Sequence, residues 1–338
     1  MELYGGIDLH SNNCVVVLLD EEDRTVLEKR LTNNLDGILL AMADFREAVR
    51  GIAVKSTYNW YWLVDGLMDA GHALHLTNTA AVKQYEGLKY AGDRHDARWL
   101  AHLLRLGILP EGYIYPKEDR PVRDLLRKRS QLVRQRTQNI LSIQNLFARN
   151  IAMRITADDV RKMTPDDVDG CLASSDLAQA VKSTHAIYRC QCEEIRRLEK
   201  ITRGRVKSRP EFKLLQSVPG IGDILAMTIL LEMGTVDRFP SAGKFASYCR
   251  CVKSSRKSNG KNKGSGNRKN GNRYLSWAFA EAATFAVRFS SRIKKYHQKK
   301  KAKRAPAVAC NAVAHKLARA CYHILRDSVP FDIDRAFV

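Results

Sequence analysis

Apolar positions along the first hundred residues fall into two patterns. Short runs rich in β-branched and apolar residues predict strands, and they cover residues 3–9, 14–19, 25–31, 51–54 and 72–77. Spacing in threes and fours predicts helices over 35–49, 60–70 and 93–106. The first three strands have short connections, which predict an antiparallel meander, and the later strands alternate with helices. This order predicts a mixed α/β sheet covered by helices.

A different pattern begins after about residue 110. Apolar positions in 120–149 recur at spacings of three, four and seven and are interleaved with arginines, and 176–203 repeats the pattern. Two such helices joined by a short helical link predict a coiled-coil arm that also touches phosphate. A solvated helical spacer is the alternative interpretation.

A second globular part is expected from about residue 211. Helices are predicted over 223–233, 274–290, 293–304 and 306–326. The predicted organisation is therefore an acidic α/β domain, a helical arm and a mainly α domain, over 1–110, 111–210 and 211–338.

The phrase Pro219-Gly220-Ile221-Gly222 stands directly before one of these helices. A proline and two glycines at such a turn are typical of a helix-hairpin-helix. The backbone N–H groups of Gly220, Gly222 and the start of the following helix would then hold a DNA phosphate. The alternative is a tight turn used only for packing.

The net charge of the chain indicates what kind of partner it binds. The 338 residues carry 57 Lys and Arg against 36 Asp and Glu, a formal net charge of +21. An excess of this size favours a polyanionic partner. No acidic residue occurs between Arg238 and Ala280, where the chain is also rich in Gly, Asn and Ser. We expect a loop that binds a nucleic-acid backbone through Arg250, Lys253, Arg256, Lys257, Lys261, Lys263, Arg268, Lys269 and Arg273.

Other classes of protein are less compatible with the sequence. No uninterrupted apolar run approaches the roughly 20 residues of a membrane span, and no signal peptide is expected before the first strand. The eight cysteines are too scattered for a disulfide framework. The expectation is a cytoplasmic protein with no membrane partner.

Three aspartates are candidate metal ligands. Asp8 lies within an apolar strand, where a carboxylate needs a cation or donors to offset its lost solvation. Asp93 and Asp96 are three residues apart on a predicted helix and therefore share a face. Together they could hold Mg²⁺, which prefers oxygen ligands, beside a scissile phosphate. Capping of the helix N-terminus is the alternative for Asp93 and Asp96.

These motifs resemble, over essentially the whole chain, the DEDD-type transposases of insertion sequences. This is the one-hundred-ten and eleven-eleven group, also called bridge-RNA-guided serine recombinases. The matching phrases are Gly6-Ile7-Asp8-Leu9-His10, Ser56-Thr57-Tyr58-Asn59-Trp60-Tyr61-Trp62-Leu63, Gly92-Asp93 with Asp96-Ala97-Arg98, Pro219-Gly220-Ile221-Gly222, and Ser258-Asn259-Gly260-Lys261 with Lys269-Asn270-Gly271-Asn272.

The resemblance implies a fold, a chemistry and a set of partners. It implies a front domain of the ribonuclease-H-like, resolvase-type fold, in which four acids bind Mg²⁺, and a back domain with a serine nucleophile. It also implies donor and target double-stranded DNA, a structured guide RNA encoded by the element, and a homodimer or homotetramer. The acids correspond to Asp8, Asp93 and Asp96, and the fourth, normally Glu, corresponds to position 55.

This chain departs from the family pattern at position 55, which is Lys. At about 4 Å and an effective dielectric constant near 20, each contact between an ammonium and a carboxylate is worth roughly 4 kcal/mol before desolvation. Lys55 could therefore compete with weakly held Mg²⁺. Our hypothesis is that the metal site of this chain is crippled or dead.

The family's serine phrase aligns best with Ser258, and Ser254 and Ser255 are the alternatives. All three serines could instead line a phosphate-binding loop. Two other functions remain open at this point. One is a junction-resolving or RNA-cleaving nuclease of the same fold, which would use water as its nucleophile. The other is a nucleic-acid-binding protein without catalysis.

Overall fold

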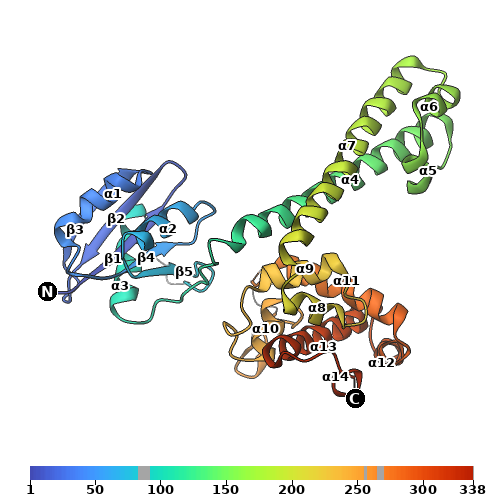
Figure 1. The fold of residues 1–338 in the computed structure, drawn as a ribbon. Helices are drawn as coiled ribbons and strands as arrows, with labels where there is room; N and C mark the ends of the chain where they lie inside the picture. Colours follow the sequence, from blue (N-terminus) through green and yellow to red (C-terminus); the bar gives the residue numbers. More distant parts are fainter. Residues whose placement is uncertain (83–91, 255–256, 265–269, 338) are drawn as a thin grey trace. The chain divides into compact units, whose positions relative to one another are not determined.

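A computed structural model describes residues 1–82, 92–254, 257–264 and 270–337. The chain divides into two compact units, Met1–Lys117 and Glu118–Val338, and each is described here by itself. The first unit is α/β and the second is mostly helical (Figure 1). The division into three parts remains a prediction, since the long helices belong to the second of these two units.

The first unit is built on a mixed five-stranded sheet. Its strands are β1 (Leu3–Leu9), β2 (Asn13–Leu19), β3 (Thr25–Thr32), β4 (Val49–Lys55) and β5 (Leu74–Thr77), in the order β3-β2-β1-β4-β5. The meander predicted from the short connections is confirmed, because β2 pairs antiparallel with both β1 and β3. β4 and β5 continue the sheet parallel to β1.

Residue alternation along β1 divides its side chains between two faces of the sheet. Leu3, Ile7 and Leu9 belong to one apolar cluster with residues of α1 (Leu35–Met42) and α2 (Tyr61–Asp69). Residues of β2 on the other face pack against Ala97 and Ala101 of α3 (Asp93–Arg105). Asp8 alternates with the first set and is therefore on the α3 face.

The predicted helix over 35–49 is too long. α1 ends at Met42, a short 3₁₀ turn covers Ala43–Phe45, and β4 already starts at Val49. The amide of Leu3 donates to the carbonyl of Ala48, so the sheet begins where the helix was expected to continue. Long-range pairing with β1 here overrides the local helical spacing.

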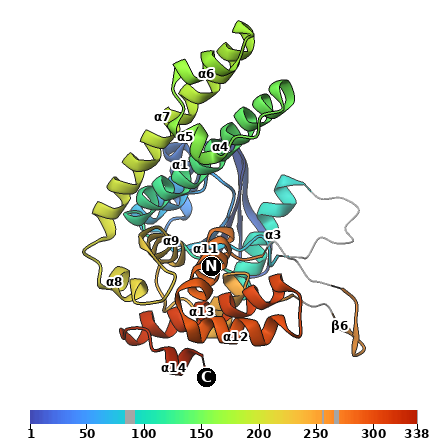
Figure 2. The ribbon, with the colours of Figure 1, turned by 90° about the vertical axis from the view of Figure 1, so that its right-hand side faces the viewer.

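Two long helices dominate the start of the second unit. α4 (Asp119–Ile151) and α7 (Ser175–Val206) lie side by side, and α5 (Ala157–Lys162) and α6 (Pro165–Cys171) connect them (Figures 1 and 2). A buried cluster at the connecting end includes Ile143, Phe147 and Val181. Both helices were predicted; coiled-coil packing and a role in assembly remain predictions.

The rest of the second unit contains one largely buried helix, α9 (Asp223–Met233). Every residue from Leu225 to Met233 is buried. α8 (Pro210–Gln216) and α11 (Arg273–Phe289) pack against it, and α13 (Pro306–Asp327) packs against both of these helices. α10 (Ala242–Tyr248), α12 (Ser291–Lys301) and α14 (Ile333–Ala336) in turn pack against α13 (Figure 1). This core accounts for the helices predicted over 223–233 and 274–326.

A buried carboxylate connects the long helix α4 to this core. Glu232 on α9 is 1 % exposed and accepts from Nε and Nη2 of Arg127 on α4, at 2.6 and 2.7 Å. The side-chain amide of Asn272, at the start of α11, also donates to Glu232 at 2.7 Å. Three elements distant in sequence are thereby joined through one charged group.

We expect Arg127→Ala to lower the free energy of unfolding by about 3 kcal/mol, because it removes two short charged hydrogen bonds from a buried carboxylate. Arg127 is itself about one third exposed, which keeps the effect at the lower end of the usual range. Urea denaturation measures the change. Arg197→Ala removes an exposed pair with Glu194 and should change stability by less than about 0.5 kcal/mol. Equal losses in both variants would contradict this account.

Candidate active site

The sheet brings Asp8 and Lys55 together. Asp8 is near the carboxyl end of β1, and Lys55 is the last residue of the neighbouring parallel strand β4. Ile7 pairs with Val54, so the two strands end side by side. Carboxyl ends of parallel strands are a common location for functional side chains in α/β sheets.

A glycine brings the helix α3 onto this edge. A Cβ atom at Gly6 would collide with the backbone carbonyl of Ala97, so only glycine permits the observed approach of α3 to β1. Asp93 and Asp96 occupy the first turn of α3. The three predicted aspartates therefore meet at one place, as the sequence analysis expected.

Lys55 lies in the centre of this acidic cluster. Its Nζ is 2.9 Å from Oδ1 of Asp8 and 2.9 Å from Oδ2 of Asp96. The side chain of Asp8 is 1 % exposed and that of Lys55 is 28 % exposed, so solvent screens this pair only partly. The ammonium group thus bridges two of the three carboxylates.

The other carboxylate contacts come from His10 and Arg30. Nε2 of His10 is 3.2 Å from Asp8 and 3.3 Å from Asp93, and Nη2 of Arg30 is 2.6 Å from Asp93. Side-chain amides of Asn33 and Asn59 donate to the carbonyl of His10 and hold that residue in place. Sequence reasoning did not select His10 or Arg30. His10 was within reach, because it belongs to the phrase that contains Asp8.

The pKa values follow from these contacts. Burial lowers the pKa of Lys55, but its close contacts with Asp8 and Asp96 raise it by more, so the pKa lies above its ordinary value. Lys55 is therefore a cation throughout the neutral range. A hydrogen bond from Arg30 lowers the pKa of Asp93, with smaller contributions from the charges of His10 and Lys55. Asp93 is therefore an anion in the same range.

Part of the cluster fits a divalent cation. Oxygen atoms of Asp8 and Asp93 and a ring nitrogen of His10 lie within 4.8 Å of one another. Neither oxygen of Asp8 accepts a hydrogen bond of good geometry from the part of the chain described here, although Lys55 and His10 are at ion-pair distance. A buried carboxylate needs a cation to offset its lost solvation, a role that Lys55 fills here and that a metal ion would fill in its place.

The basic loop of the second unit contains a small hairpin. β6 (Lys257–Ser258) and β7 (Lys261–Asn262) pair antiparallel around Asn259 and Gly260, both of which have positive φ, as in a type I′ turn. Ser258 directly precedes this turn and is exposed.

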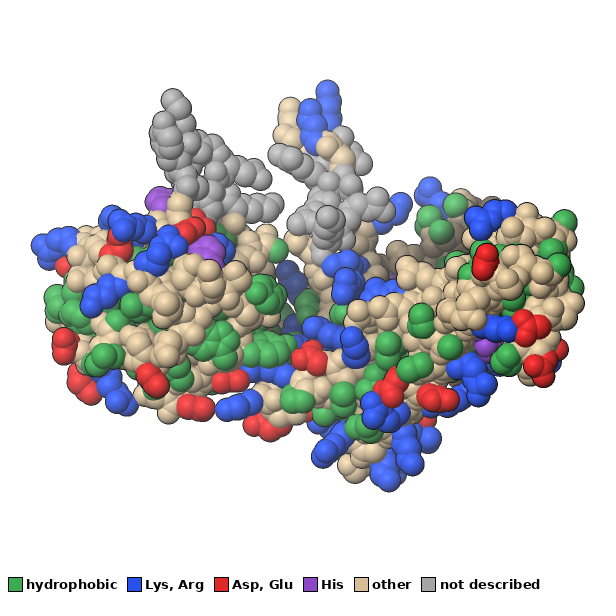
Figure 3. Space-filling model, turned by 90° about the horizontal axis from the view of Figure 1, so that it is seen from above, with side chains coloured by type: hydrophobic (Ala, Val, Ile, Leu, Met, Phe, Trp, Pro, Cys, Tyr) green, Lys and Arg blue, Asp and Glu red, His purple; other side chains and the backbone are tan. Residues whose placement is uncertain are grey.

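The predicted nucleic-acid contacts of the loop fall into three groups. Lys253, Lys261, Lys263 and Arg273 are exposed. Arg250 donates through Nη2 to the carbonyl of Gly271 at 2.8 Å, which joins the two ends of the loop. Arg256, Arg268 and Lys269 are outside the described residues, as is the alternative nucleophile Ser255, and Lys257 belongs to β6. On the face seen in Figure 3, basic side chains are spread widely over the surface, which suits a general attraction to phosphate.

The predicted helix-hairpin-helix turn has a packing role at one of its glycines. Gly220 has φ +89°, and a Cβ there would be 2.5 Å from the Ala282 carbonyl and from the Ala286 amide of α11. Gly222 has nothing within 4 Å of its Cβ position. Asp223, the first residue of α9, already pairs with Arg203 at 3.0 Å. Phosphate binding at this turn remains a prediction.

The two glycines therefore give a matched test. Gly220→Ala should lower the free energy of unfolding by about 2 kcal/mol or more, because a methyl group collides with α11 and φ is unfavourable. Gly222→Ala should leave stability within about 0.5 kcal/mol, since its surroundings are open. DNA affinity at fixed salt then tests the turn: a loss in Gly222→Ala supports phosphate binding, and unchanged affinity leaves only the packing role.

Together, the sheet, its acidic edge and the basic helical unit define a class of protein. They are consistent with a ribonuclease-H-like enzyme that processes DNA. The chain belongs to the DEDD-type IS110/IS116 transposases. A model described as "Transposase" in the DEDD IS110 group matches residues 5–150, and one for the transposase IS116/IS110/IS902 family matches residues 212–298. No curated protein matched the chain.

Membership of this family has direct consequences. Transposases bind DNA, and DEDD transposases use divalent metal ions, so the acidic cluster is the candidate metal centre of a DNA-processing enzyme. Among the described residues, no helix is both long enough and apolar enough to cross a membrane.

Proposed function

We propose that this protein is an RNA-guided DNA recombinase of an insertion sequence whose catalytic centre is weakened by Lys55. The observation that supports the proposal best is the meeting of Asp8, Asp93 and Asp96 at one edge of the sheet, with Lys55 between two of them. Family membership supports the transposition chemistry, and the net charge of +21 supports nucleic-acid partners.

In the proposed reaction, a serine cleaves one DNA strand. The Oγ atom of Ser258 loses its proton and attacks the scissile phosphorus, the bond from phosphorus to the leaving oxygen breaks, and that oxygen gains a proton to become a hydroxyl. A hydroxyl from the partner strand then loses its proton and attacks the phosphoserine; the new phosphodiester forms, the bond from phosphorus to Oγ breaks, and Ser258 regains a proton. The ester energy is retained, so ATP is not needed. Ser258 is exposed on a hairpin, where a strand can reach it.

Asp8, Asp93 and His10 are the residues that would hold a divalent cation, taken here to be Mg²⁺. When bound, such an ion stabilises negative charge on the phosphate under attack. Asp96 would complete the oxygen ligands, but Lys55 engages it instead. We therefore propose that this chain binds nucleic acid while its strand cleavage is weak or absent.

A second candidate function follows from the same ion pairs. If Lys55 permanently satisfies Asp8 and Asp96, the protein is a nucleic-acid-binding member of its family without catalysis. A third candidate, a junction-resolving nuclease of the same fold, would need the acids but no serine. A covalent adduct with DNA separates the recombinase from the nuclease, because only a protein nucleophile forms one.

The proposed partners are donor and target double-stranded DNA and a structured guide RNA encoded by the element. A homodimer or homotetramer would supply two active sites, with α4 and α7 as the assembly element. The test is strand exchange between donor and target plasmids with that RNA and Mg²⁺. Exchange that is faster with, or confined to, the Lys55→Glu variant supports the proposal. Equal exchange by both proteins contradicts the weakening by Lys55, and no exchange by either contradicts the recombinase.

A further inference from the structure

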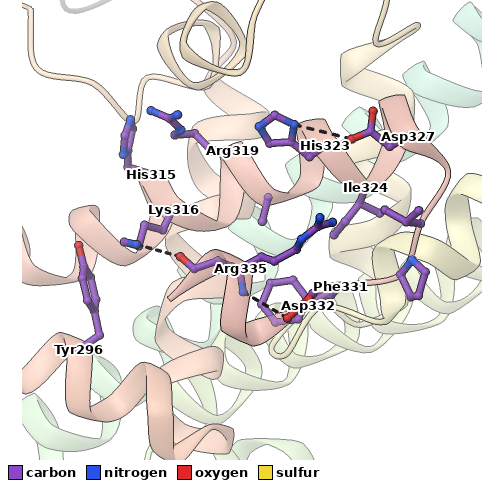
Figure 4. Close-up of a pocket in the computed structure, with 14 residues that line it drawn as sticks. Tyr296, His315, Lys316, Arg319, His323, Ile324, Asp327, Phe331, Asp332 and Arg335 are labelled. Atoms are coloured by element: carbon purple, nitrogen blue, oxygen red, sulfur yellow. Dashed lines mark hydrogen bonds and ion pairs between the residues drawn. The ribbon is translucent and has the colours of Figure 1, made fainter. Parts of the chain in front are cut away.

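A cavity of about 620 Å³ lies in the second unit, between α13 and the segment that follows it. α12 contributes Tyr296 to its wall, and α14 contributes Arg335 (Figure 4). The volume is in the range of small-molecule sites. None of the residues selected from the sequence lines it.

Basic side chains gather along one face of α13 in this cavity. His315, Arg319 and His323 are four residues apart in succession, so they share one face of the helix (Figure 4). Arg335 faces the same space from α14. Lys316 is held beside them, because its Nζ donates to the carbonyl of Ala336 at 2.8 Å.

The acidic groups of the cavity wall are already engaged. Asp327 pairs with Nε of Arg326 at 2.7 Å, and Asp332 accepts from the backbone amides of Asp334 and Arg335 at 2.8 and 3.2 Å. Within the described ranges, no carboxylate lies at ion-pair distance from the side chain of Arg319 or from that of His315. Asp327 also lies 3.9 Å from His323, so it is Arg319 and His315 that have no carboxylate partner among the described residues.

The pKa values of Lys316 and His315 agree with an excess of positive charge in the cavity wall. Burial lowers the pKa of Lys316, and the nearby charges of Lys300 and Arg319 lower it further. Burial also lowers the pKa of His315, again with contributions from Arg319 and Lys316. At Lys55, by contrast, two carboxylates raise the pKa of the ammonium. A bound anion would relieve the repulsion between Lys316 and Arg319 and would favour protonation of His315, which its lowered pKa keeps mostly neutral at neutral pH.

The residues that line the cavity indicate which kind of anion it would bind. Guanidinium groups bind phosphate through paired hydrogen bonds, and arginine is the common choice for this ligand. The rest of the wall includes the aromatic residues Tyr296 and Phe331 and the aliphatic Ile324. A ligand that combines a phosphate with a flat, partly apolar ring system fits both halves of this wall.

We propose that this cavity binds a nucleoside phosphate, with the phosphate on Arg319, His315 and Arg335 and the nucleoside against the aromatic wall. The nucleotide could be free or could be the terminal unit of a nucleic-acid strand. This inference goes beyond the proposed recombination. Nucleotide binding is measured without guide RNA, a second DNA or divalent metal. The proposed nucleotide site and the proposed recombination can therefore each fail without the other.

The test is isothermal titration calorimetry of the full chain at about 0.15 M salt, which screens general attraction. Adenosine monophosphate should bind and adenosine should not. Arg319→Ala should weaken binding by about 10- to 100-fold, the usual effect of losing a charged hydrogen-bonding partner. Arg319 is exposed and has no carboxylate partner among the described residues, so Arg319→Ala should leave the fold of the protein unchanged, which thermal denaturation checks. Arg335→Ala gives an independent second variant.

Arg134→Ala is the matched control, since it removes one exposed arginine of the same unit, on α4, that does not line the cavity. Equal losses in Arg319→Ala and Arg134→Ala, or equal affinity for adenosine and its monophosphate, would overturn the proposal.

A trinucleotide with a 5′-phosphate, compared with its 5′-hydroxyl counterpart, then identifies the source. Tighter binding of the phosphorylated strand that depends on Arg319 assigns the cavity to a strand end. Equal binding of the two strands, with retained binding of the mononucleotide, assigns it to a free nucleotide.

Discussion

Replacing Lys55 by Glu is expected to convert this chain from an inactive or weak recombinase into an active one. The substitution removes the ammonium that bridges Asp8 and Asp96 at 2.9 Å and restores the fourth acid. Each such contact is worth roughly 4 kcal/mol before the cost of desolvation, and the partial exposure of Lys55 reduces that interaction energy. We expect Mg²⁺ affinity to rise at least about tenfold. Calorimetry measures the affinity, and plasmid strand exchange measures the activity.

The neutral variant Lys55→Gln separates two causes. It removes the competing cation without adding a ligand, so its Mg²⁺ affinity should fall between those of the parent and Lys55→Glu. The apo form of Lys55→Glu should be less stable than the parent, because four carboxylates then repel one another, and Mg²⁺ should restore its stability. Equal, tight Mg²⁺ binding by the parent and Lys55→Glu would show that Lys55 is tolerated.

Ser258→Ala is expected to abolish the covalent link between protein and DNA. The measurement belongs in the Lys55→Glu background, where cleavage is expected. A labelled DNA substrate should give a protein–DNA band under denaturing conditions, and Ser258→Ala should reduce it by at least about a thousandfold, because removing a nucleophile eliminates the reaction path.

Ser254→Ala, in the same background, is the matched control. Ser254 is an exposed serine of the same loop but lies outside the hairpin. Its adduct should form at about the parental level. Retention of the adduct in Ser258→Ala with its loss in Ser254→Ala would move the nucleophile, and loss in neither would leave Ser255 as the remaining candidate of the three.

The sequence by itself predicted most helices and strands and the candidate residues Asp8, Lys55, Asp93 and Asp96. Apolar runs and helical spacing predicted the five strands of the sheet and the long helices, because burial imposes a period of two on strands and about 3.6 on helices, but they did not predict the short strands β6 and β7. The spacing of Asp93 and Asp96 predicted their shared face. The departure at Lys55 was also visible in the sequence, because the other motifs of the chain match the pattern of the DEDD-type transposases.

Tertiary structure decided how those residues interact. Parallel pairing of β1 with β4 put Lys55 beside Asp8, and the contact of Gly6 with α3 added Asp96. The shortened helix α1 likewise reflects pairing with β1 rather than local propensity.

His10 and Arg30 joined the site only through folding, as did the cations of α13 in their cavity. The physical reason is the same in each case. Local periodicity is a property of adjacent residues, whereas ion pairs and cavities depend on distances between elements that are far apart along the chain.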